Sequence, residues 1–256
     1  MTDGPRLDLL RPRDVGALFR DSLSAYLRHF VPFVAIGAAV VVPVMFVVSG
    51  IGLGQLSGGF EGNPGRGAIA VVGAESYLIV GPLVTAMVIH ALLAVADGHR
   101  PRTGAAIQSG LEAFRPVFIA VVIGAAGVFV GILFFILPGI WLGVRWYLAP
   151  QAVVVDGRRG VGALERSAEL VSGQWWRVLG VLLFAFIATG IAQAAVQTPF
   201  TVLADLANSS ALTLMGQMVS LALTAPFQAL MLTLLYFDLL ARRSLPAMVP
   251  PVQPPL

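Results

Sequence analysis

Two ionisable residues stand inside apolar segments of the sequence and are the first candidates for chemistry. Glu75 lies in the apolar segment 68–96, and Arg145 lies in the segment 140–155. An ionisable side chain within a bilayer is costly, so it is a functional candidate by default. Counted from the start of each segment, both residues lie roughly 8–10 Å below the same boundary. A pair at that depth would form an outward-facing site for a lipid headgroup or substrate. Alternatively, the pair locks two helices together, or the two side chains extend separately to water.

Two later apolar segments each carry a stripe of polar residues with the spacing of one helix face. The members recur every three or four residues: Thr189, Gln193, Gln197 and Thr201 in the first stripe, and Gln217, Ser220, Thr224 and Gln228 in the second. Such residues either hydrogen-bond across a pair of packed helices or line a hydrophilic groove. The candidate ligand or ion-pair residues are therefore Glu75, Arg145, Gln193, Gln197, Gln217 and Gln228.

The sequence lacks the groups that an enzyme or a metal centre requires. Its three histidines, His29, His90 and His99, stand apart from one another, and it contains no cysteine. Without cysteine there is neither a disulfide nor a thiolate metal site. No acid is paired with a base, and no nucleophile stands beside a base. We therefore expect no catalytic residue, no bound metal and no cofactor.

The composition of the chain indicates an integral membrane protein. Hydrophobic residues make up 57% of its 256 residues and charged residues only 11%, whereas a soluble domain has about 25% charged residues. Long apolar segments without alternating polarity favour helices over a β-barrel. We expect an all-α fold of six spans in three hairpins, at 30–54, 68–96, 116–137, 140–155, 178–204 and 211–237.

The ends and turns of this fold also have signals in the sequence. Pro138-Gly139 is expected to make the tight turn between the third and fourth spans. Residues 1–244 are expected to form a single membrane domain. The segment 245–256 contains five prolines, so we expect a disordered or polyproline-like tail there.

The arginines define the expected orientation in the membrane. They gather before the first span, between the second and third, between the fourth and fifth, and after the sixth, whereas the alternate loops contain only Arg66. Because cytoplasmic loops carry the excess of positive charge, both termini are expected in the cytoplasm. The net charge of +3 is too small to indicate a nucleic-acid partner.

A short motif recurs ahead of the expected hairpins. Six of eight positions agree between 13–20 and 159–166, and a weaker copy lies at 104–109. Each copy has the pattern of an amphipathic helix that lies on the membrane surface. Chance similarity among alanine- and glycine-rich segments is the alternative explanation of the repeat. The expected interfacial helices, all on the cytoplasmic side, are 13–29, 103–115 and 158–173.

Charged and aromatic residues in and beside these helices are expected to face the membrane surface. Arginine attracts anionic headgroups, and tryptophan prefers the interface between lipid and water. The expected lipid contacts are Arg20, Arg158, Arg159, Arg166, Trp175, Trp176 and Arg177. Asp238 and Arg242 stand four residues apart at the inner boundary, so we expect them to form an ion pair.

Two segments carry a resemblance to a known family. The first begins with Trp-Leu-Gly-Val-Arg-Trp-Tyr-Leu-Ala-Pro at 141–150 and ends with Gly-Gln-Trp-Trp-Arg at 173–177; the second is Leu-Tyr-Phe-Asp-Leu-Leu-Ala-Arg-Arg at 235–243. They resemble the membrane domain of the glycerophosphoryl diester phosphodiesterase family and related uncharacterised six-span bacterial membrane proteins. Asp156 departs from this pattern, because the family more often has glutamate there, and Leu239-Leu240 stand where an arginine is expected.

The resemblance implies a multi-pass protein of the bacterial plasma membrane. It does not imply hydrolase activity, because no segment between the expected spans is long enough for the soluble hydrolase domain, and the histidine pair of that enzyme is missing from the sequence.

Our leading hypothesis is a non-enzymatic multi-pass protein that serves as a scaffold or accessory component of a membrane-lipid or envelope complex. Three basic amphipathic segments on one leaflet motivate it. The expected partners are membrane lipids, with anionic headgroups on the cytoplasmic leaflet, and membrane proteins. The alternative is a transporter or lipid translocator that uses an outward-facing site with Glu75 and Arg145. An intramembrane enzyme is the third hypothesis, which the missing acid–base pair disfavours.

Overall fold

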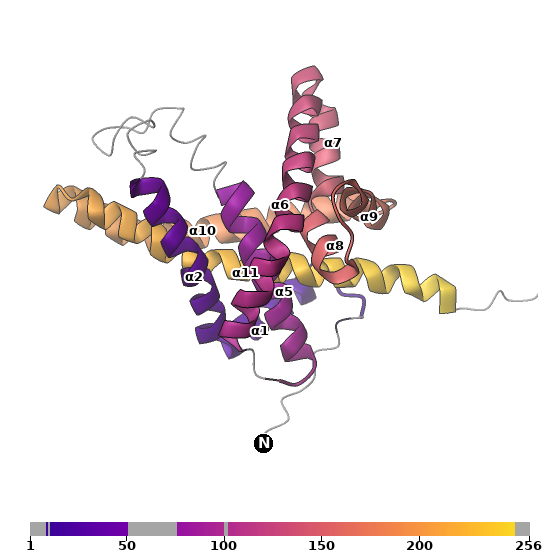
Figure 1. The fold of residues 1–256 in the computed structure, drawn as a ribbon, viewed down its shortest axis with the longest axis horizontal. Coiled ribbons are helices and arrows are strands. Elements are labelled where there is room, and N and C mark those ends of the chain that lie inside the picture. Colours follow the sequence, from indigo (N-terminus) through magenta and orange to yellow (C-terminus); the bar gives the residue numbers. More distant parts are fainter. Residues whose placement is uncertain (1–8, 10, 51–75, 100–101, 249–256) are drawn as a thin grey trace, which may run out of the picture.

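The computed structural model describes residue 9 and residues 11–50, 76–99 and 102–248 of the chain. Within these ranges all regular structure is helical, so the protein is all-α. One turn of π-helix, Ser76–Val80, leads directly into α5. The α-helices (Figure 1) are α1 Val15–Arg28, α2 Phe30–Gly50, α5 Gly81–Ala96, α6 Thr103–Phe134, α7 Ile136–Trp146, α8 Ala149–Asp156, α9 Val161–Val171, α10 Trp175–Ala207 and α11 Ser210–Met248.

Five helices among the described residues are long and apolar enough to cross a membrane: α2, α5 with part of the preceding π-turn, α6, α10 and α11. The segment 140–155, expected as a further span, is divided between α7 and α8, which have 11 and 8 residues. Pro150 explains the break, because its ring would overlap the carbonyl group of Trp146 if one helix continued. Tyr147 and Leu148 form a turn there instead.

The segments expected as interfacial helices take two forms. α1 lies within 13–29 and α9 lies within 158–173, and both are short separate helices. The segment 103–115 is the first part of α6, which continues through Pro116 without a break.

The ends of the chain's helices also differ from the expected spans. α2 begins at Phe30 as expected and is described as far as Gly50. Glu75 and the first residues of the expected second span lie outside the described residues. α11 continues to Met248, four residues into the expected tail, and the rest of that tail lies outside the described residues.

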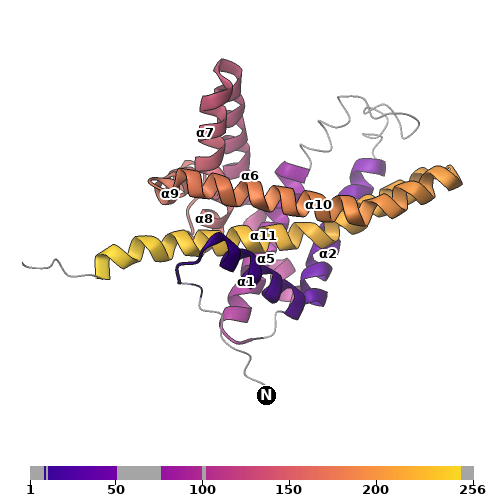
Figure 2. The ribbon, with the colours of Figure 1, turned by 180° about the vertical axis from the view of Figure 1, so that it is seen from behind.

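α11 runs through the middle of the molecule (Figures 1 and 2). α10 packs along it, and α1, α2 and α5 also contact it. Its segment 229–239 is buried throughout. α2 approaches closely at Gly37, where a Cβ atom would overlap the Ala222 carbonyl oxygen. A small residue at such a crossing lets the two helix backbones touch.

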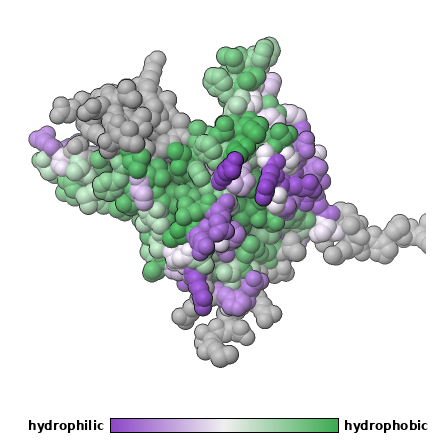
Figure 3. Space-filling view, in the orientation of Figure 1, coloured by the Kyte–Doolittle hydropathy of each residue, from purple (hydrophilic) through white to green (hydrophobic). Residues whose placement is uncertain are grey.

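α6 and α7 form a hairpin that projects from the rest of the molecule (Figure 1). The expected turn at Pro138-Gly139 is wrong by three residues, because the chain reverses at Phe135, whose backbone is extended. Gly139 instead lies inside α7 and is buried against α6, where a Cβ atom would stand 2.7 Å from the backbone nitrogen of Ile132. The tip of the hairpin is apolar and exposed (Figure 3); its most exposed side chains are Leu133, Phe134, Phe135 and Leu137.

Two hydrogen bonds fix the position of α7 relative to α9 and to the start of α10. Ser167 of α9 donates a hydrogen bond to the Arg145 carbonyl oxygen, at 2.6 Å, and the Trp175 indole donates to the Trp141 carbonyl oxygen, at 3.3 Å. The last turns of α7 therefore lie beside α9 and the start of α10. From there to the tip α7 extends about 16 Å, roughly half of the hydrocarbon core.

We predict that the hairpin turn ends within the lipid rather than on the outer side. Because the chain contains no cysteine, single cysteines can report this with a membrane-impermeant maleimide on intact cells. Ala207→Cys, at the exposed last residue of α10, is expected to react from outside, and Arg158→Cys only after permeabilisation. Leu137→Cys is expected to react only in detergent. Labelling of Leu137→Cys from outside as fast as Ala207→Cys would contradict the prediction and support six crossings.

Candidate functional site

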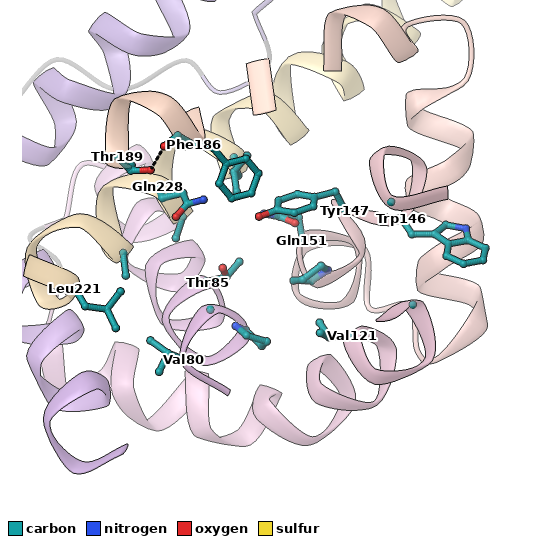
Figure 4. A pocket seen from close by; sticks show the side chains of 18 of the residues that line it. Val80, Thr85, Val121, Trp146, Tyr147, Gln151, Phe186, Thr189, Leu221 and Gln228 are labelled. Atoms are coloured by element: carbon teal, nitrogen blue, oxygen red, sulfur yellow. Dashed lines mark hydrogen bonds between the residues drawn. The ribbon is translucent and has the colours of Figure 1, made fainter. Parts of the chain in front are cut away.

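A cavity of about 390 Å³ lies between α5, α6, α7, α8, α10 and α11 (Figure 4). This volume is typical of small-ligand pockets, which are mostly apolar with a few polar groups. Aliphatic and aromatic residues, glycines and prolines make up most of the wall, and none of the lining residues is charged. The polar side chains in the wall are Thr85, Tyr147, Gln151, Thr189, Gln193 and Gln228.

Gln151 is the most deeply buried polar residue of this cavity wall. It lies on α8, directly after the Pro150 that separates α8 from α7, and its side chain is 1% exposed. Its Oε1 atom is buried and accepts no hydrogen bond from the described residues. An unsatisfied buried acceptor costs about 1–3 kcal/mol, so this oxygen is a place where a ligand would stabilise the protein. The sequence gives no periodic signal for Gln151, because it belongs to neither polar stripe.

The two polar stripes meet at one hydrogen bond. The Gln193 Nε2 atom of α10 donates to the Thr224 hydroxyl of α11 at 2.9 Å, and Thr224 donates in turn to the Ser220 carbonyl oxygen. This pair corresponds to the expected bond between two packed helices. Gln193 and Gln228 also line the cavity, whereas Gln197 and Gln217 are not part of its wall.

The expected pair of Glu75 and Arg145 stays a prediction, because Glu75 lies outside the described residues. The Arg145 guanidinium stacks over the Trp141 ring, with its central carbon 4.3 Å from the ring centroid. Such a cation–π contact partly replaces the water that the guanidinium loses. Arg145 is not among the residues of the cavity wall.

A second polar site surrounds Asp238 of α11, whose side chain is fully buried. One carboxylate oxygen accepts from the backbone N–H of Arg13 at 2.6 Å. The other accepts from Arg177 of α10 at 2.6 Å and from Arg242 at 3.0 Å. Both guanidinium groups also donate to the Arg13 carbonyl oxygen. This arrangement contains the expected pair of Asp238 with Arg242 and adds two partners that spacing along one helix does not reveal.

Arg13 is itself held by several groups. Its side chain is almost fully buried, and its Nε atom lies 2.9 Å from Asp21 of α1. Its NH1 group donates to the carbonyl oxygens of Leu9 and Arg11. The segment that precedes α1 is therefore fixed to α11 by both its backbone and its side chain.

Arg166 of α9 makes a separate ion pair next to the end of α8. Its Nε atom lies 2.5 Å from Asp156, and its NH1 atom lies 3.3 Å from Glu169. The hydrogen bond that Arg166 donates to the Asp156 carboxylate raises the pKa of Arg166 above its ordinary value. The Arg166 guanidinium is therefore charged at any physiological pH. Because it already pairs with two carboxylates, it is less available to a lipid headgroup.

The other expected lipid contacts differ in exposure. Arg20, Arg158 and Arg159 are exposed. Trp176 is 79% exposed, whereas Trp175 is partly buried and packs edge to face against it, with ring centroids 4.7 Å apart. Arg177 is engaged by Asp238, so Arg20, Arg158, Arg159 and Trp176 are the members of this set most available to headgroups.

One family matches the chain over residues 77–237, and its description is "Domain of unknown function (DUF7847)". The chain belongs to this family. The DUF7847 match spans the helices that line the cavity, and it ends one residue before Asp238. No curated protein and no solved structure matches the chain. None of these comparisons links it to the glycerophosphoryl diester phosphodiesterase family, so that resemblance stays a prediction.

We predict that Asp238→Asn destabilises the protein by about 3–5 kcal/mol, because it removes the only carboxylate that the structure shows bonded to the partly buried Arg177. Unfolding of the detergent-solubilised protein, followed by helix content against denaturant, would measure the effect. Asp205→Asn is the matched control: Asp205 is exposed on the last turn of α10, so its replacement is expected to cost less than about 0.5 kcal/mol. Equal stabilities of the two variants would show that the Asp238 cluster does not hold the fold.

Proposed function

We propose that this chain is a non-enzymatic multi-pass membrane protein that holds a membrane lipid between its helices and serves as a scaffold or accessory component of a membrane-lipid or envelope complex. The observation that carries the proposal is the cavity of about 390 Å³, whose wall is uncharged and holds neutral polar groups. Four of the helices that line it, α5, α6, α10 and α11, are long and apolar enough to cross a bilayer. In such surroundings the molecule with ready access is a lipid rather than a water-soluble metabolite.

The rim of the cavity supports access from the bilayer. Phe186 and Gly190 of α10 line the cavity and are exposed on the apolar surface of that helix, Phe186 by 47%. On α7, Gly143 lines the same cavity and has no side chain to close the space. An acyl chain could pass between α7 and α10 without leaving the hydrocarbon region.

Surface charge supports an orientation with the basic side towards the cytoplasm. The exposed arginines Arg20, Arg28, Arg115, Arg158 and Arg159 lie on α1, on α6 and beside α9. On the face seen in Figure 3, hydrophilic residues gather near α9 and the first part of α6, away from the hairpin tip. We propose that this side faces the anionic inner leaflet of a bacterial plasma membrane, with both termini cytoplasmic.

An even number of crossings agrees with that orientation. The sequence favours six, as three hairpins each preceded by an interfacial helix; the short α7 favours four, with the α6–α7 hairpin turning back inside the lipid. The cysteine labelling of Leu137 distinguishes the two.

The transporter or lipid translocator remains the second candidate, since a lipid-binding cavity is also what a translocator needs. Its proposed site with Glu75 and Arg145 has less support, because the Arg145 backbone lies beside α9, which follows the exposed Arg158 and Arg159, and the Arg145 guanidinium stacks on Trp141. A translocator would move lipid between leaflets of a liposome and lose that flux on Glu75→Gln. An accessory lipid-binding protein would show no flux.

We predict that filling the cavity removes a bound lipid. Ala225 of α11 lies in the cavity wall, whereas Ala192 of α10 lies on the exposed surface outside it. Ala225→Trp is expected to abolish the lipid that purifies with the protein, as measured by extraction and mass spectrometry, and Ala192→Trp is expected to retain it. Equal lipid content in both variants and the wild type would overturn the proposed binding site.

We also predict that the basic surface sets a preference for anionic membranes. Arg20, Arg158 and Arg159 replaced together by Gln should weaken any dependence of stability or activity in liposomes on anionic lipid, by about 1 kcal/mol per exposed arginine. The comparison is between liposomes with and without phosphatidylglycerol. Identical behaviour of the wild type in both would exclude this role for the arginines.

A further inference from the structure

We propose that the cavity recognises a neutral lipid by its hydroxyl group, which donates a hydrogen bond to the buried Gln151 Oε1 atom; this inference rests on the proposed lipid-binding function. Two observations support it. The Gln151 Oε1 atom is buried and accepts no hydrogen bond from the described residues, and the cavity wall in which it lies contains no charged side chain.

The cavity wall has no charged side chain, and this favours an uncharged lipid headgroup. A phosphate group held there would be buried without a positive partner, and an ammonium group without a negative one, and either is costly in an apolar site. Arg145, the nearest arginine along the chain, stacks on Trp141 and is not in the wall. The headgroup that fits this wall is therefore uncharged.

The hydrogen-bond capacity of the wall selects the polar group. Gln151 Oε1 needs a donor. The Gln193 amide and the Thr189 hydroxyl already donate to Thr224 and to the Ala185 carbonyl oxygen. Gln228 reaches the same cavity from α11 (Figure 4), and an amide offers both a donor and an acceptor. A lipid hydroxyl can donate to Gln151 and accept from an amide N–H, which a carbonyl ester alone cannot do.

The remaining wall fits the start of a hydrocarbon chain. Val80, Val121, Leu221 and Leu232 line the cavity from three helices, and Phe186 stands at its rim. The volume of about 390 Å³ holds a headgroup and part of one chain, so the rest of the lipid extends between α7 and α10 into the bilayer. Diacylglycerols and polyprenols share this chemistry.

The first test compares headgroups on the same acyl chains, with wild-type protein stripped of lipid in detergent. The probes are 1,2-dioleoylglycerol, its acetylated derivative without a free hydroxyl, and dioleoyl phosphatidylglycerol; binding is measured by native mass spectrometry. We expect dioleoylglycerol to bind at least about tenfold more tightly than either other lipid. A polyprenol in the same assay decides which of the two hydroxyl lipids binds better. Equal binding of dioleoylglycerol and its acetylated derivative to the wild-type protein would overturn the proposal.

The second test removes the acceptor. Gln151→Leu is expected to lose about tenfold in affinity for dioleoylglycerol, yet to be at least as stable as the wild type without lipid, because a buried unsatisfied oxygen is gone. Gln197→Leu, on the same face as Gln193 but outside the wall, is the matched control and should bind like the wild type. Unchanged affinity of Gln151→Leu would overturn the inference, while lipid loss in Ala225→Trp would still support the proposed function. Failure of every lipid to bind would overturn both.

Discussion

A carboxylate that is fully buried must replace the water it loses with donors and positive charge, and Asp238 obtains them from three separate parts of the chain. The segment before α1 supplies a backbone N–H, the first turn of α10 supplies Arg177, and the next turn of α11 supplies Arg242. Because both arginines also donate to the Arg13 carbonyl oxygen, the three partners are connected through Arg13 as well as through Asp238. The positions of α1, α10 and α11 at this end of the molecule depend on that one side chain.

The cavity lies where the helix packing is interrupted. α7 and α8 are separated at Tyr147-Leu148 ahead of Pro150, and α8 places Gln151 in the wall of the cavity. Without that break a single long helix would pack beside α6, and the amide would have a different direction. The same proline thus accounts for the end of α7 at Trp146 and for the separate helix α8 that carries the buried acceptor.

Much of the fold can be predicted from the sequence, because apolar length and the absence of alternation are local properties. The beginning of α2, the helical structure of the described parts of the expected spans and the short helices α1 and α9 follow from such patterns. The turn at Phe135 does not, since Pro138-Gly139 has the stronger local turn signal and Gly139 is needed for contact with Ile132. The partners of Asp238 could not be predicted, and neither could the lack of a hydrogen-bond donor for Gln151 Oε1 among the described residues, because both depend on residues brought together by tertiary packing. Gln193 and Gln228 could be identified by their periodicity, but that periodicity does not separate them from Gln197 and Gln217.

The residues bonded around Asp238 lie partly inside and partly outside the region of the family match, and this matters when relatives are compared. Arg177 lies inside the matched region, whereas Arg13, Asp238 and Arg242 lie outside it. A homologue without the segment that bears Arg13 would leave Asp238 short of one donor and both guanidinium groups short of one acceptor. Aspartate at position 238 and arginine at positions 177 and 242 are therefore expected to co-vary with the presence of that N-terminal segment, so that gain or loss of α1 and of the charged triad occurs as one evolutionary unit.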